Sequence, residues 1–194
     1  MATNTWTGGT STAWNNAANW SQSNWPGDTG FEDDDVVIPD TSDPAVNRPE
    51  VSLDVTINSL KVEADGELAG NTSYTLTLQG DNGSGYVIVF ADDSAIGTDV
   101  NITVITDSAV SADMGAGSGT IRNLTINDAS CVLTQAGACE INGNLTITAG
   151  ELNTNASSNH ALTVTGDVDI NGSSSVLTTN ASAVTVRAIS TTSS

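Results

Sequence analysis

The chain has 194 residues and a formal net charge of −19, with 23 acidic residues against four lysines and arginines. Four scattered cations cannot form the basic patch that holds a phosphate backbone, so we expect no nucleic-acid partner. No run approaches the ~18 consecutive apolar residues of a membrane-spanning helix, and we expect no membrane partner. The length suits one domain with a sizeable core, and because only 4% of residues are aromatic that core must consist of Val, Ile, Leu and Ala.

The first 50 residues form a segment of their own, because the polar stretch "TWTGGTSTAWNNAANWSQSNWPGD" (5–28) holds all four tryptophans. One interpretation is that these large rings cover the open end of the structure that follows. The other is that flat rings interleaved with amide side chains form a surface for a protein or a sugar. We predict that residues 1–50 are an N-terminal cap and attachment region, with these candidate partner-binding residues: Trp6, Trp14, Trp20, Trp25 and Phe31.

The run "DDVVIP" (34–39) holds three consecutive β-branched residues and stops at Pro39. β-branched residues are enriched in strands, and the later runs of the chain alternate apolar and polar residues, as in a strand that turns one face inward. We predict that this run is the first strand entering a repeat structure.

Residues 51–194 repeat with a period of about 22 residues. The stretches "ACEINGNLTI" (138–147) and "ALTVTGDVDI" (161–170) match position by position, "AVTVRAI" follows from 183, and "VTINSLKV" (55–62) fits with one deletion. This alignment puts Gly143 in register with Gly166, and it places Cys139 opposite Leu162 and Val55 at inward positions. A phased repeat of short strands predicts a parallel β-solenoid of six or seven coils rather than an antiparallel sandwich.

The residue types that carry catalysis or metal binding are sparse. The one histidine, His160, lies in a polar corner, and the carboxylates of Asp92, Asp93 and the run 32–35 lack the paired arrangement of a hydrolase. We predict no catalytic residue, no cofactor and no metal, with calcium at 32–35 as an alternative. Cys131 and Cys139 are predicted to be buried thiols, with a disulfide as the alternative.

The two ends of the chain suggest where it attaches. The last residues, "AISTTSS" (188–194), are rich in Ser and Thr, and we expect a mobile end that is a poor candidate for a tight interface. The start, "MATNTWTGG", lacks the basic and apolar regions of a secretory signal. Either a signal was trimmed or the protein is assembled inside a cell.

The opening residues 5–39 contain a motif of the form W-x-G…NW…P…D-x-V-x-I. This motif resembles the start of bacterial β-helix repeat proteins of the adhesin and autotransporter-passenger type, although the signal, the translocator barrel and the long tandem array of those proteins are missing. It also resembles β-helical phage virion proteins of the capsid decoration, head-fibre and tail-fibre type.

The second resemblance implies a non-enzymatic virion protein, either a capsid decoration (cement) subunit or a fibre-like subunit of a bacteriophage, assembled in the host cytoplasm. Its partners would be the major capsid protein or other virion proteins, with a homo-oligomer as a further candidate. The first resemblance implies the alternative, a secreted adhesin-type module that binds carbohydrate or a host surface outside the cell. A polysaccharide-active enzyme is a remote third reading.

Overall fold

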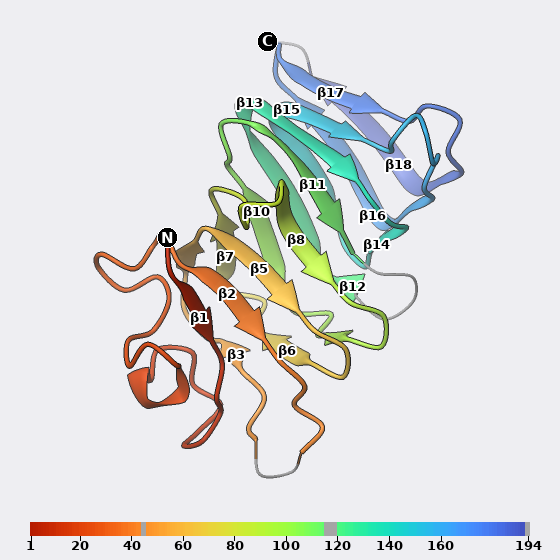
Figure 1. Ribbon diagram of the computed structural model, residues 1–194. Helices are drawn as coiled ribbons and strands as arrows, with labels where there is room; N and C mark the ends of the chain where they lie inside the picture. The colour runs from red at the N-terminus through yellow and green to blue at the C-terminus, as the bar shows by residue number, and fades with distance from the viewer. Residues whose placement is uncertain (44–45, 115–119, 193–194) are drawn as a thin grey trace.

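Short parallel strands wind into a β-solenoid of about seven turns, so the predicted fold is confirmed. The computed structural model describes residues 1–43, 46–114 and 120–192. Within these ranges the one helical element is a single 3-10 turn, η1 (Ala17–Asn19). The colours of Figure 1 follow each other in order along the stack, because each turn lies on the one before it. No helix among the described residues is long and apolar enough to cross a membrane.

The strands form three walls, which we call A, B and C. The bounds are β1 (Thr3–Thr5), β2 (Asp35–Ile38), β3 (Glu50–Val51), β4 (Val55–Ile57), β5 (Ser59–Val62), β6 (Glu67–Gly70), β7 (Thr75–Leu78), β8 (Tyr86–Phe90), β9 (Ala95–Ile96), β10 (Asn101–Val104), β11 (Ala109–Asp113), β12 (Thr120–Ile121), β13 (Asn123–Gln135), β14 (Cys139–Ile141), β15 (Leu145–Asn153), β16 (Leu162–Asn171), β17 (Ser175–Thr178) and β18 (Val184–Thr192). Wall A begins with β4, β7 and β10, wall B with β1, β2, β5, β8 and β11, and wall C with β3, β6 and β9. From β13 onward several strands bend at a corner and run from one wall into the next.

Each wall sends columns of aliphatic side chains inward. In wall A the successive rungs are in register and the inward residues of one column are Val55, Leu76, Ile102, Leu124, Leu145 and Val168. All of them are buried, while the residue that follows each of them along its strand is partly exposed on the outer face. Because parallel strands lie about 4.8 Å apart, each side chain packs directly on the one below it and little apolar surface remains open to water.

The predicted register is right for the last coils and wrong for Val55. Cys139 pairs with Leu162, and the Gly166 N–H donates to the Gly143 carbonyl at 2.8 Å, as the repeat indicated. Val55, however, pairs with Leu76 in wall A, whereas Cys139 lies in wall C. The apolar-x-apolar pattern is the same on every wall, so it shows that Val55 points inward without showing which wall it belongs to.

The parallel ladder reaches into the first 50 residues. The run "DDVVIP" forms β2, as predicted, and β2 pairs with β5 on one side and with β1 on the other. The stack of strands therefore starts at β1, well before residue 51, and the remaining segment between β1 and β2 folds over its first turn (Figure 1).

Candidate functional site

Three of the four tryptophans close the N-terminal end of the solenoid. Trp6, Trp14 and Trp20 are at most 3% exposed and belong to the same apolar core as the inward columns. The ring centroids of Trp6 and Trp20 lie 4.9 Å apart at 82°, and those of Trp14 and Trp20 lie 4.8 Å apart at 66°. These edge-to-face contacts are the favoured geometry of packed rings. We call this group the Trp lid.

Every indole N–H of the Trp lid donates to a backbone carbonyl. Trp6 donates to Asn47 at 2.5 Å, Trp14 to Pro26 at 2.9 Å and Trp20 to Trp14 at 2.6 Å. The rings thus bury both their apolar surface and their polar atom within the chain. This is the covering role that the sequence suggested, and it leaves Trp6, Trp14 and Trp20 no surface in this structure with which to contact a partner.

The backbone around the Trp lid is held by a buried asparagine that the sequence did not single out. The Asn19 Oδ1 accepts from the backbone N–H groups of Thr10 and Ser11 and from the Thr10 hydroxyl, and its Nδ2 donates to the Ser11 hydroxyl and the Ala13 carbonyl. The buried Asn19 amide is thus fully paired, and it ties together residues 10, 11 and 13 of the loop. Nothing in the Asn-rich pattern of this segment distinguishes Asn19 from its neighbours.

The two other predicted partner-binding residues remain accessible. Trp25 is half-buried and packs against the core, while Phe31 is 36% exposed. Both lie in a tight loop in which the Gly27 N–H donates to the Phe31 carbonyl at 3.0 Å and the Phe31 N–H donates to the Asp28 carbonyl at 2.8 Å. We call residues 25–31 the Trp25–Phe31 loop. It is the part of the cap where large aromatic surface meets solvent.

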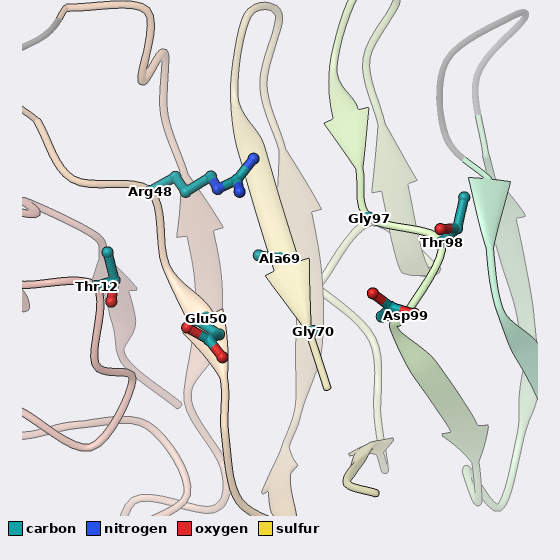
Figure 2. Close-up of a pocket in the computed structure, with 8 residues that line it drawn as sticks. All are labelled: Thr12, Arg48, Glu50, Ala69, Gly70, Gly97, Thr98 and Asp99. Carbon is teal, nitrogen blue, oxygen red and sulfur yellow. The ribbon is translucent and has the colours of Figure 1, made fainter. Parts of the chain in front are cut away.

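A shallow depression of about 370 Å³ opens on the outside of wall C (Figure 2). Its lining combines the small residues Ala69, Gly70 and Gly97 with five polar residues: Thr12, Arg48, Glu50, Thr98 and Asp99. The Glu50 N–H donates to the Thr12 carbonyl at 2.8 Å, which joins the cap to β3. Arg48 is paired with Glu67 at 3.2 Å and both side chains are largely exposed. The depression is an open, polar surface without an ordered set of catalytic groups.

The carboxylates of the acidic run 32–35 point to different partners instead of converging. Glu32 accepts from the Gly30 N–H, Asp33 from the Gln79 amide and Asp35 from the amide of Asn58 and the hydroxyl of Ser59. Within the described part of the chain, no three His, Cys, Asp or Glu side chains gather in a group that could hold a metal ion. Calcium at this run therefore has no preformed cage.

Asp34, the fourth member of the run, is buried beneath the cap. Its Oδ2 accepts from the Asn4 Nδ2 at 3.0 Å, and Asn4 is itself completely buried. Burial raises the pKa of Asp34, the hydrogen bond from Asn4 opposes that rise, and neighbouring Asp35 adds to it. A carboxylate in this setting costs stability when it is ionised.

The other candidate residues lie on different parts of the solenoid. Asp92 and Asp93 are exposed in the turn between β8 and β9. His160 is half-buried in the loop before β16, where its backbone N–H donates to the Thr154 carbonyl. Cys131 and Cys139 are free, buried thiols, as predicted. Burial raises the pKa of Cys131 to about 11 and that of Cys139 to about 12, so neither is a reactive thiolate at neutral pH.

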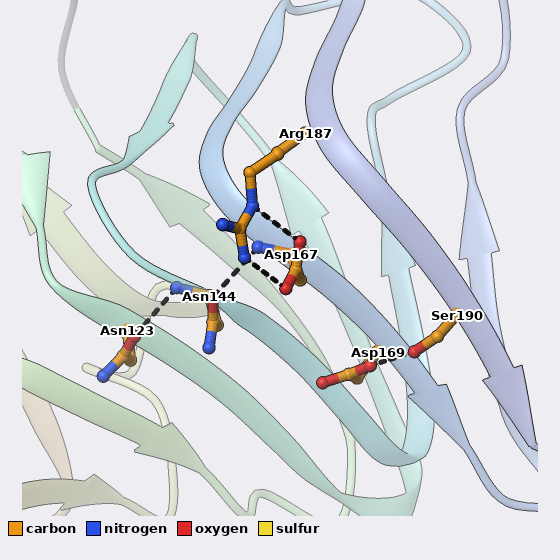
Figure 3. A network of polar contacts seen from close by, with 6 residues as sticks. All are labelled: Asn123, Asn144, Asp167, Asp169, Arg187 and Ser190. Carbon is orange, nitrogen blue, oxygen red and sulfur yellow. Dashed lines mark hydrogen bonds and ion pairs between the residues drawn. The ribbon is translucent and has the colours of Figure 1, made fainter.

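A ladder of asparagines runs along the corner between walls C and A. An asparagine precedes the first inward residue of three successive wall-A strands, in the repeated segments "NITV", "NLTI" and "NLTI" that begin with Asn101, Asn123 and Asn144. The Asn123 Nδ2 donates to the Asn101 Oδ1 at 2.9 Å, and the Asn144 N–H donates to the Asn123 Oδ1 at 2.8 Å. The Asp167 N–H continues the ladder onto the Asn144 Oδ1 at 2.9 Å (Figure 3).

The ladder ends at an exposed ion pair, in which the Arg187 guanidinium donates to the Asp167 carboxylate and lowers its pKa. The three Asn-x-Thr sequences that begin at positions 101, 123 and 144 supply the asparagines of this ladder.

Comparison with known proteins gives no relative. No protein-family model matches the chain, and no curated protein and no solved structure matches it significantly. The case for a function therefore depends on the architecture itself.

Proposed function

We propose that this protein is a non-enzymatic structural subunit of a bacteriophage virion, a capsid decoration or fibre-like subunit that attaches through its N-terminal cap. The observation that carries the proposal is that the aromatic residues of the cap fall into a buried group and an accessible group. The three tryptophans of the Trp lid are buried where they close the solenoid, while the Trp25–Phe31 loop presents accessible aromatic surface at that same end. A closed end that still presents an aromatic anchor suits a surface used for docking.

The body of the molecule suits a stiff spacer. On walls A and B parallel ladders join the successive turns, and the aliphatic core runs along the stack, so the described residues show no hinge between turns. A net charge of −19 keeps neighbouring copies apart and soluble. Both properties support a role in which the solenoid projects from a particle surface.

The surroundings of the anchor indicate the chemistry of the partner. Phe31 lies next to Glu32 and Asp33 and within a few residues of Asp28. A surface that receives it would offer an apolar pocket for the ring and basic groups around the rim. We assign that surface to the major capsid protein or another virion protein.

Mass spectrometry of gradient-purified phage particles tests the proposal. We expect the protein to co-purify with the particles at a copy number comparable to that of other structural proteins, and its gene to lie among capsid and portal genes. Recovery from the cell surface or the culture medium, with none in the particles, would instead favour the adhesin-type alternative and overturn the proposal.

A further inference from the structure

The C-terminal end of the solenoid is open, in contrast to the N-terminal end. Along the column of wall A, Leu145 and Val168 are 0% exposed, whereas Ile189 on the next rung is 55% exposed. The other two walls show the same change, since Leu152 and Leu162 are fully buried and the residues stacked on them, Leu177 and Val184, are only partly buried. The inward apolar columns therefore end at a surface that the described chain does not cover.

The backbone at this end is also unpaired on one side. Strand β18 (Val184–Thr192) pairs with β16, and among the described strands nothing pairs with its other edge. The structure thus continues the strand to Thr192, where the sequence suggested a mobile end. A long edge strand beside an open apolar core is a ready template for another strand. At the opposite end the Trp lid prevents this.

The same end carries no acidic side chain, a property it shares only with residues 1–27 at the closed end of the solenoid. All 23 acidic residues lie at or before Asp169, and residues 170–194 contain no aspartate or glutamate. The one charged side chain there, Arg187, is paired with Asp167 of the preceding turn. Two copies of a chain with a net charge of −19 repel each other wherever their acidic surfaces approach, and the open end is an apolar surface where they can meet with little repulsion.

We propose that the open C-terminal end binds the same end of a second copy, giving a two-fold symmetric, tail-to-tail dimer. A two-fold axis perpendicular to the solenoid reverses the strand direction, so the two β18 edges meet in antiparallel fashion and the exposed columns pack on each other. Head-to-tail growth is blocked because the Trp lid closes the other end. The dimer is therefore a closed assembly, and each cap stays at an outer tip.

Analytical ultracentrifugation of the full chain tests the proposal. We expect a dimer whose small-angle scattering profile shows about twice the length of one solenoid. Replacing Ile189 with Asp puts a charge on the exposed apolar column and should weaken the dimer at least about 100-fold while the circular dichroism spectrum stays unchanged. The matched control is Thr185→Asp, which places the same charge on the outward face of β18 and should leave the dimer intact.

Two further measurements keep the test decisive. Phe31→Asp changes the cap and should not alter the dimer, which separates this inference from the proposed attachment surface. In hydrogen exchange, the β18 amides should gain protection as the protein concentration rises. A chain that stays monomeric, a dimer that survives Ile189→Asp, or one lost equally in Thr185→Asp would overturn the proposal.

Discussion

Truncating one inward leucine offers the sharpest test of the stacked core. Leu152 is fully buried in wall B between Leu133 and Leu177. The change Leu152→Ala removes three carbon groups, worth about 2.4 kcal/mol at roughly 0.8 kcal/mol each. The ladder spacing holds the turns above and below in place, so the cavity cannot collapse and adds about 1 kcal/mol. We expect the free energy of unfolding to fall by about 3 to 4 kcal/mol.

The matched control is Leu177→Ala, in the same column on the last turn. Leu177 is only partly buried, so the same truncation should cost about 1 kcal/mol. Urea unfolding followed by far-UV circular dichroism, at protein concentrations where the chain is monomeric, measures both. Equal costs for the two variants, or a cost below about 1 kcal/mol for Leu152→Ala, would refute the reasoning that one continuous column passes through this wall.

Three other predictions concern the cap and the thiols. Trp14→Ala should lower the free energy of unfolding by about 3 to 5 kcal/mol, while Phe31→Ala costs under about 1 kcal/mol; similar values in urea titrations would mean that the lid is not packed as described. Because the folded-state pKa of Asp34 is raised, its ionisation costs stability at neutral pH and the cost disappears as pH falls below its usual value of 3.8. Asp34→Asn should therefore stabilise the protein at pH 7 and have little effect near pH 3 in thermal melts, and a loss of stability at pH 7 would contradict this. Cys131 and Cys139 should resist a thiol reagent at pH 8 until denaturant is added; rapid labelling of the native protein would show that they are exposed.

Periodicity was sufficient to predict the fold because each wall obeys the same two-residue rule. The residues Leu145, Val164 and Leu162 could be assigned to the core from their alternation alone, and β2 could be placed at the entrance of the stack from "DDVVIP". The wall that each strand joins could not be predicted as reliably. Val55 shows why. Its apolar-x-apolar pattern fits a strand of any wall, and only the lengths of the segments between strands decide which wall the strand joins.

The candidate site was less predictable, because aromatic composition does not reveal burial. The same four tryptophans suit a lid or a binding surface, and only the packing of Trp6, Trp14 and Trp20 against the first turn distinguishes the two. The asparagine ladder was within reach of the sequence, because Asn101 and Asn123 recur at one phase of the repeat. The role of Asn19 was not, since it depends on a loop conformation with no repeated counterpart.

Attachment through the Trp25–Phe31 loop is the central claim, and binding of purified protein to particles that lack it tests that claim most directly. The wild-type protein should bind, and Phe31→Asp should weaken binding by at least about 30-fold while the protein stays folded. Val176→Asp, which alters an exposed apolar residue near the other end, should bind like wild type. Undiminished binding of Phe31→Asp, or equal loss in Val176→Asp, would contradict the account.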